Sequence, residues 1–171
     1  MTIEPSFAPE VIVQGVEPAG QVEQLARDKA TDVAKRHPEA LVLGADTVVV
    51  LDGRILGKPN DEDHARSMLR TLSGRSHVVY TGIALVHSAS GRVHSRHACT
   101  QVTFAALSDS EIRRYVEGGS PMDKAGAYGI QDDAGSLFIE RIDGDYYNVV
   151  GLPLRTLYVS LVTEFADLLE G

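Results

Sequence analysis

Asp123–Gln131 (DKAGAYGIQ) and Gly144–Leu154 (GDYYNVVGLPL) restrict the fold of this chain more than any other part of its sequence. A glycine inside a helix or strand costs backbone entropy, and a chain accepts that cost where it must turn tightly or approach a ligand closely. We therefore expect irregular segments around a binding site in this region. Its glycines are Gly119, Gly126, Gly129, Gly135, Gly144 and Gly151.

The length and composition of the chain are those of an ordinary globular domain. The 171 residues fit a single domain over 1–171, with 43% hydrophobic and 23% charged residues. The net charge of -8 argues against a nucleic acid polymer as partner, because such partners need a basic surface. A single nucleotide stays possible, since one triphosphate needs only a few local cations and a metal.

The single cysteine, Cys99, excludes a disulfide within the chain and fits a reducing compartment. Cys99 lies in an alternating segment and is expected to pack in the core rather than act as a nucleophile. No apolar run approaches the length of a membrane span, and the first residues lack a signal-peptide pattern. We expect a cytoplasmic protein without a membrane partner.

Hydrophobic periodicity and turn signals divide the chain into alternating strands and helices. Because helices alternate with strands and adjacent hairpins also occur, the pattern predicts an α/β fold with a twisted, mixed sheet flanked by helices. Strands are expected at Val11–Val13, Leu41–Leu51, Arg54–Leu56, His77–Val86, Arg92–Leu107 and Leu137–Ile142. Helices are expected over 21–37, after an Asn60 cap, after the Ser108 capping box, and from Pro153 with a stripe of Leu154, Leu157, Tyr158, Leu161, Phe165, Leu168 and Leu169.

Asp46 stands at the centre of an apolar strand, in LVLGADTVVV. A carboxylate there loses hydration unless hydrogen bonds or a cation compensate. It either accepts backbone N–H bonds at a strand end, or it binds a divalent metal or activates water as a base. Gly44, two residues earlier, would let another backbone or a ligand come near.

Two lysines have positions that suit phosphate binding. Lys58 lies between Gly57 and Pro59, which restrict its backbone, and an ammonium is a compact charge for a phosphate. Lys29 lies four residues beyond Leu25, on the same helix face as that buried position. It either extends along the edge of the apolar stripe to reach solvent, or it points toward the site.

The motifs GADTVV, GKP, AGAYGIQ and DYYNVVGLP, with LARDKA on the first helix, resemble those of the Maf family (septum formation inhibitor-like) of nucleoside triphosphate pyrophosphatases. The resemblance extends from about Leu25 to Leu157. It implies a Maf/ITPase-like fold with two lobes around a nucleotide cleft. It also implies that Asp46 is the proton acceptor, that Lys58 and Lys29 face the phosphates, and that Mg²⁺ or Mn²⁺ is the cofactor.

The resemblance also implies how the base is selected. Thr47 and Gln131 match positions that would read the base, and an amide can pair with a carbonyl and an imide N–H together. The form AGAYGIQ resembles the branch that acts on dTTP and UTP, although that branch usually has Gly after the Gln and this chain has Asp132. Lys124 would contact phosphate or simply pair with Asp123.

Maf proteins open with a strand followed by a Ser-x-Ser-Pro-Arg-Arg motif at the start of a helix. This chain begins with Met1–Phe7 (MTIEPSF), which aligns just after that helix. Either the natural start lies upstream, or the protein lacks these arginines and is a catalytically weak, nucleotide-binding regulatory protein linked to cell division. The next motif of the family, Val-Asp-Glu, is proposed to help hold metal. It reads Val16-Glu17-Pro18 here, so Glu17 is the expected metal ligand beside Asp46.

The resemblance thus predicts hydrolysis of dTTP, UTP and modified pyrimidine nucleotides to the monophosphate and pyrophosphate. Homodimerisation is a further expectation that comes from the resemblance alone.

Overall fold

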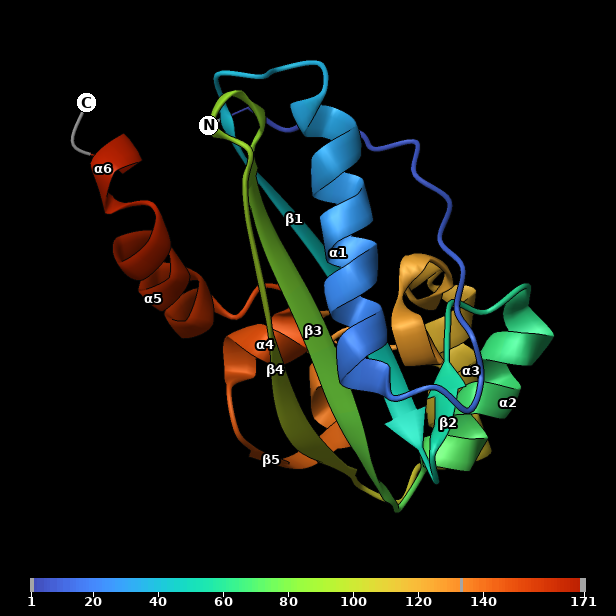
Figure 1. Ribbon diagram of the computed structural model, residues 1–171. Coiled ribbons are helices and arrows are strands. Elements are labelled where there is room, and N and C mark those ends of the chain that lie inside the picture. Colours follow the sequence, from blue (N-terminus) through green and yellow to red (C-terminus); the bar gives the residue numbers. More distant parts are fainter. Residues whose placement is uncertain (1, 133, 170–171) are drawn as a thin grey trace.

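A computed structural model describes residues 2–132 and 134–169 of the chain. Its strands form one sheet in the order β2-β1-β3-β4-β5, and helices lie on both faces of it (Figure 1). The strands are β1 (Leu41–Leu51), β2 (Arg54–Leu56), β3 (Ser76–His87), β4 (Arg92–Phe104) and β5 (Ile139–Asp143). The helices are α1 (Pro18–Ala34), α2 (Glu62–Leu72), α3 (Asp109–Glu117), α4 (Tyr146–Val150), α5 (Leu154–Glu164) and α6 (Ala166–Leu169).

Every pair of strands described is antiparallel, so the expectation of a mixed sheet is wrong, while the α/β fold with flanking helices is confirmed. The start of β3 explains the difference, because Val78 pairs with Val50 near the end of β1. Hairpin strand β2 and helix α2 therefore form an excursion that returns the chain to the same end of the sheet. From there β3 can only run antiparallel to β1.

Helix α1 packs directly on the backbone of the two central strands. A Cβ added at Gly44 of β1 would meet the Ala26 carbonyl oxygen, and one added at Gly82 of β3 would meet the Val22 carbonyl oxygen. Glycine at both positions lets the helix come closer than any side chain would allow. The helix begins earlier than expected, at Pro18, because Glu17 caps it by accepting bonds from the N–H groups of residues 19 and 20.

The opposite face of the sheet carries the larger hydrophobic core. The apolar stripe of α2 lies there together with α3 and the side chains of β1, β3 and β4. The helix expected after Asn60 is confirmed, although the cap is Asp61 rather than Asn60. The capping box of Ser108 and Glu111 is present as expected. The core consists of Val49, Leu51, Ala65, Met68, Leu69, Leu72, Val79, Val102, Phe104, Ile112, Tyr115, Val116, Ala127, Tyr128 and Phe138.

Residues 2–17, the described part of the chain before α1, contain no strand, so the expected strand at Val11–Val13 is wrong. Glutamine side chains take the place of a strand partner here. The Gln21 amide donates to the carbonyl and accepts from the N–H of Val13, at 2.9 and 2.7 Å, and Gln14 makes the same pair of bonds with the backbone of Ile55. The segment therefore follows α1 toward β2 without joining the sheet (Figure 1).

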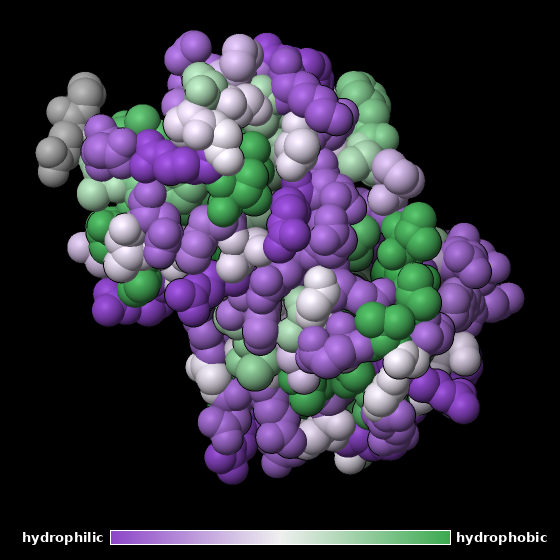
Figure 2. All heavy atoms as spheres, in the orientation of Figure 1, coloured by the Kyte–Doolittle hydropathy of each residue, from purple (hydrophilic) through white to green (hydrophobic). Residues whose placement is uncertain are grey.

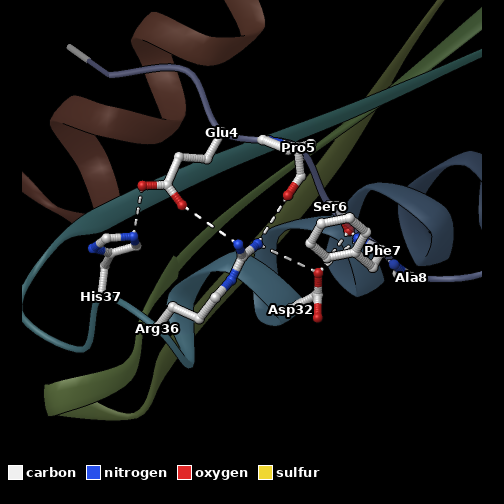
Figure 3. Close-up of polar contacts among 8 residues, drawn as sticks. All are labelled: Glu4, Pro5, Ser6, Phe7, Ala8, Asp32, Arg36 and His37. Carbon is white, nitrogen blue, oxygen red and sulfur yellow. Dashed lines mark hydrogen bonds and ion pairs between the residues drawn. The ribbon is translucent and has the colours of Figure 1, made fainter.

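The start of this segment is attached to the C-terminal end of α1 (Figure 3). Arg36 lies over the ring of Phe7 and donates to the Pro5 carbonyl at 2.9 Å. Glu4 contacts the imidazole of His37 at 2.8 Å, and Asp32 accepts a bond from the Phe7 N–H at 2.8 Å. These contacts hold the segment across the helix and fix the direction in which it continues toward the site.

The C-terminal helical region differs from its prediction in two ways. Phe165 interrupts it, so that α5 and α6 replace one helix. Most of the predicted apolar stripe is not in the core, since Phe165 is its only buried member among the described residues. Figure 2 shows hydrophobic residues at the surface over these helices.

Two further expectations concern the rest of the chain. Cys99 is exposed, so the expectation that it packs in the core is wrong. The buried side chains nearby in β4 are Thr100, Val102 and Phe104. None of the helices that the structure describes combines the length and the apolar character that a membrane span needs.

Candidate active site

A cavity of about 450 Å³ collects almost all the residues that the sequence predicted for the site. This volume is in the range of small-molecule pockets. Lys29 enters from α1, Asp46 and Thr47 from β1, and Lys58 from the loop after β2. Lys124 and Gln131 come from the glycine-rich loop, residues 123–131. Glu17 does not line the cavity, because its carboxylate caps the start of α1.

The cavity lies at an edge of β1. Within the described residues, β2 pairs only with Val49–Leu51, so the preceding part of β1 has a strand partner on one side alone, β3. Successive side chains of a strand point to opposite faces. Asp46 accordingly meets Lys29 on the α1 face, and Thr47 meets Thr81 on the other face. The open edge brings both faces to the same cavity.

A chain of alternating charges occupies the α1 side of the cavity. The Lys29 Nζ lies 2.6 Å from the Asp46 carboxylate and 2.7 Å from that of Glu10. The second oxygen of Glu10 lies 3.7 Å from the Lys58 Nζ. Glu10 thus bridges the two lysines that the sequence predicted for phosphate binding. No sequence pattern had indicated this role of Glu10.

Burial and pairing act on the two ends of the Asp46–Lys29 pair in different ways. Burial raises the pKa of Asp46, and the hydrogen bond from Lys29 opposes that rise. Burial alone would lower the pKa of Lys29, but its hydrogen bonds with Asp46 and Glu10 raise it. The hydrogen bond from Lys29 lowers the pKa of Glu10. Lys29 is therefore a firmly charged cation, while Asp46 takes up a proton more readily than a free aspartate.

The close approach of α1 to β1 puts Lys29 within reach of Asp46. Leu25, one turn earlier on the same face, is buried and also lines the cavity. Lys29 lies at the edge of this apolar face, and its ammonium reaches the carboxylate of Asp46. Of the two alternatives for Lys29, the structure favours the one in which it points toward the site.

The glycine-rich loop turns through two successive left-handed residues, Gly126 with a φ of 71° and Ala127 with a φ of 61°. Alanine rarely adopts this conformation, and such local strain clusters at functional sites. The Gly126 N–H donates to the Gly57 carbonyl at 3.0 Å. This bond joins the loop that carries Gln131 to the loop that carries Lys58.

Asp132, where the chain departs from the family motif, is held by its neighbours. The Tyr115 hydroxyl donates to its carboxylate at 2.6 Å and accepts from the Gly129 N–H at 3.1 Å. The Lys124 ammonium lies 2.8 Å from Asp123 and 3.7 Å from Asp132. Of the two alternatives for Lys124, pairing with Asp123 is therefore present, and its ammonium still lines the cavity.

Among the described residues that line the cavity, carboxylates slightly outnumber ammonium groups. Lys29, Lys58 and Lys124 face Glu10, Asp46, Asp123 and Asp132. No group of three or more histidine, cysteine or acidic side chains could hold a metal ion in the described part of the chain. Mg²⁺, however, is typically bound through one or two carboxylates together with substrate phosphates, which Asp46 and Glu10 fit.

A sequence model of the family described as Maf-like protein matches residues 1–164. The chain belongs to the Maf-like family. Among relatives of this Maf-like chain is the dTTP/UTP pyrophosphatase of Salinibacter ruber, which is 58% identical over 166 residues, or 97% of this chain and 81% of the relative.

Two further relatives of the Maf-like chain carry the same name. The dTTP/UTP pyrophosphatase of Symbiobacterium thermophilum is 57% identical over 148 residues, or 86% of this chain and 74% of the relative. That of Moorella thermoacetica is 52% identical over 153 residues, or 90% of this chain and 78% of the relative. The family predicted from the sequence motifs is thus confirmed.

Proposed function

We propose that this Maf-like protein is a nucleoside triphosphate pyrophosphatase that converts dTTP and UTP to the nucleoside monophosphate and pyrophosphate. The observation that carries the proposal is the division of the cavity by the edge of β1. Asp46, Lys29 and Lys58 form a charged cluster on the α1 side, and Thr47 presents a neutral hydroxyl from the other face of β1. Gln131, on the loop that also carries Lys124, lines the same cavity. A nucleotide likewise has a charged and a neutral end, and the names of the relatives support the choice of dTTP and UTP.

In the proposed reaction, water attacks the α-phosphorus and its proton passes to the carboxylate of Asp46. The bond from the α-phosphorus to the bridging oxygen breaks, and pyrophosphate leaves with the electron pair. A raised pKa makes Asp46 a better proton acceptor than an ordinary aspartate. Lys29 and Lys58 stabilise the negative charge that develops on the leaving group.

Glu10 has to release Lys58 before a phosphate can bind there, because its carboxylate occupies the space between the lysines. The Lys58 contact is the longer one, at 3.7 Å, and both side chains are about half exposed. Exchange of this weak contact for a phosphate oxygen costs little free energy. Lys29 can stay paired with Asp46 at the same time.

The proposal includes Mg²⁺ or Mn²⁺ as cofactor, with Asp46 and Glu10 as its protein ligands. Glu10 replaces Glu17, which the sequence had predicted as the second ligand. Such an ion supplies positive charge to the phosphates, which the cavity needs because its own carboxylates exceed its lysines. A comparison of Glu10→Gln with Glu17→Gln tests the assignment. We expect only Glu10→Gln to raise the metal concentration needed for half-maximal turnover.

The wider proposal is that the protein clears surplus or modified pyrimidine nucleotides in the cytoplasm, and acts as a homodimer. Exposed apolar side chains on α5 and α6, such as Tyr158, Val162 and Leu169, support self-association. Light scattering on the purified protein would measure the mass in solution. A monomer at micromolar concentration would remove this part of the proposal.

Pyrophosphate release tests the function directly, with Mg²⁺ or Mn²⁺ and a panel of dTTP, UTP, CTP, dATP, GTP and 7-methyl-GTP. We expect selective turnover of dTTP and UTP, and a loss of about 10²- to 10⁴-fold in kcat for Asp46→Asn. Asp28→Asn, an exposed aspartate on α1, is the matched control and keeps full activity. A rise in thermal stability with dTTP but no turnover would instead favour the nucleotide-binding regulatory protein.

A further inference from the structure

A buried hydrogen-bonded relay lies behind the Thr47 hydroxyl. The hydroxyl oxygens of Thr47 and Thr81 lie 2.9 Å apart, and the Thr81 hydroxyl donates to the backbone carbonyl of Asn148 at 2.8 Å. Thr81 is completely buried on β3, directly opposite Thr47 in the strand register. Thr47 is the only member of this relay that lines the cavity.

The relay determines where the hydroxyl proton of Thr47 points. A threonine hydroxyl carries one proton and can accept two further bonds. A carbonyl oxygen can only accept a hydrogen bond, so the Thr81 hydroxyl donates its proton in the hydrogen bond to the Asn148 carbonyl. The bond between the two threonines therefore needs the proton of Thr47. With its proton directed at Thr81, the Thr47 oxygen offers only acceptor lone pairs to the cavity.

The carbonyl at the end of the relay cannot turn away. The Asn148 side chain is completely buried, and its amide donates to the Val79 carbonyl at 3.0 Å and to the Thr100 hydroxyl at 2.9 Å. These bonds attach α4 to β3 and β4 and hold the backbone of Asn148 against Thr81. Gly151 lies beside Thr47, since a Cβ there would be 3.4 Å from the Thr47 oxygen.

We propose that Thr81 is a specificity-determining positioning residue, which makes Thr47 an obligate acceptor and thereby selects bases that present an N–H group to it. This inference rests on the proposed function and concerns the same site. Uracil and thymine carry such a group at N3, whereas N3 of cytosine is an acceptor. Two acceptors facing each other leave both without a partner, which a buried site penalises strongly.

Gln131 cannot make this choice alone. Its side chain is exposed and its amide offers both a donor and an acceptor, so rotation of the amide satisfies either pyrimidine. The Thr47 hydroxyl has no such freedom while its hydrogen bond is donated to Thr81. The discrimination between imide-bearing pyrimidines and cytosine therefore depends on a residue that does not touch the nucleotide.

The test compares Thr81→Val with Thr81→Ser in the full chain. Valine keeps the volume but cannot accept a hydrogen bond, so the Thr47 proton becomes free to turn toward N3 of cytosine. We expect the ratio of kcat/KM for UTP over that for CTP to fall by about tenfold or more in Thr81→Val. Thr81→Ser retains the hydroxyl, and its ratio stays at the wild-type value.

Thr100→Val is the control for a purely structural effect. Thr100 is a threonine of similar burial that also contacts Asn148, but it has no bond to Thr47. A structural role would lower turnover of UTP and CTP in parallel and leave their ratio unchanged. An unchanged ratio in a folded Thr81→Val protein would overturn the inference, and Thr81→Ala serves the same purpose if the valine variant does not fold.

Failure of the proposed function is a separate outcome. If the wild-type protein hydrolyses no nucleotide in the panel, the pyrophosphatase proposal fails. The inference is then judged by the dissociation constants of UMP and CMP, measured by calorimetry on the same variants. Preference for UMP in the wild type and its loss in Thr81→Val would support the relay, whereas equal affinities in the wild type would overturn it.

Discussion

Asp46 and Thr47 are neighbours in β1, yet their side chains contact opposite layers of the protein. Asp46 pairs with Lys29 of α1 at 2.6 Å, and Thr47 contacts Thr81 of β3 at 2.9 Å on the other face. The alternation of a β-strand causes this division. Because the edge of β1 is open here within the described residues, one dipeptide supplies both a carboxylate and a hydroxyl to a single cavity.

The acid side of the pH profile reports the state of Asp46. Burial raises its pKa above the ordinary 3.8, and the Lys29 ammonium limits that rise. The proton acceptor must be ionised, so we expect kcat/KM for UTP to fall on acidification at a pH above 3.8. Lys29→Gln should move this limb to still higher pH. A limb in the variant at or below the wild-type position would contradict the assigned role of the pair.

The same shift affects folding in a defined direction. Because the pKa of Asp46 is higher in the folded protein, its contribution to stability is largest below pH 3.8 and is lost as the pH rises through the folded-state value. Asp46→Asn removes this dependence. We expect the free energy of unfolding of Asp46→Asn to increase relative to that of the wild type as the pH rises. Urea titrations at several pH values measure this difference.

Lys29 and Lys58 should differ in their effects on stability although both serve the phosphates. Lys29→Met leaves the Asp46 carboxylate, whose side chain is 10% exposed, without its cation, and should cost about 1–3 kcal/mol of unfolding free energy. Lys58 is 57% exposed, so Lys58→Met should change stability by less than about 0.5 kcal/mol. Denaturant unfolding measures both values, and we expect both variants to hydrolyse UTP more slowly than the wild type.

A double-mutant cycle isolates the Lys29–Asp46 contribution. In the Asp46→Asn background, no buried carboxylate is left for Lys29→Met to expose, and the loss of stability should be much smaller than in the wild type. Equal losses in the two backgrounds would show that Lys29 stabilises the fold independently of the Asp46 carboxylate, through Glu10 or through its hydrocarbon chain.

Gly44 tests the close approach of α1 that brings Lys29 to Asp46. A Cβ on Gly44 would meet the Ala26 carbonyl oxygen, so Gly44→Ala should destabilise the protein by about 3 kcal/mol and weaken catalysis by moving α1. Gly20→Ala is the matched control, because its Cβ would lie 3.6 Å from Glu17, an ordinary contact. That variant should gain about 0.5 kcal/mol in thermal or urea unfolding.

Local signals were sufficient for much of the fold. The turn at Asp52-Gly53 and the β-branched run before it defined β1 and β2 with their observed bounds. The apolar stripe of α2 was likewise visible in the sequence because its spacing follows the helical period. Strand direction could not be derived in this way, since it depends on where β3 starts relative to β1.

The same difference between local signals and tertiary contacts decides which site residues could be predicted from the sequence. Asp46 could be identified because a carboxylate in an apolar strand conflicts with its local environment. Glu10 could not, because it lies in a segment without periodicity and approaches Lys29 and Lys58 only through tertiary contacts. Thr81 also escaped notice, because a threonine is an ordinary strand residue and its role depends on its partners across the sheet.

His77, which contacts the cavity-lining Tyr128, should make the protein lose stability in mild acid. It is 2% exposed, bonds the Tyr128 hydroxyl at 2.7 Å, and burial lowers its pKa to about 4. Stability that depends on neutral His77 is present above pH 6.5 and is lost as the pH falls toward 4, by up to about 3 kcal/mol. Urea midpoints should therefore fall across this range in the wild type and much less in His77→Phe. An equal slope in His77→Phe would assign the acid sensitivity to other groups.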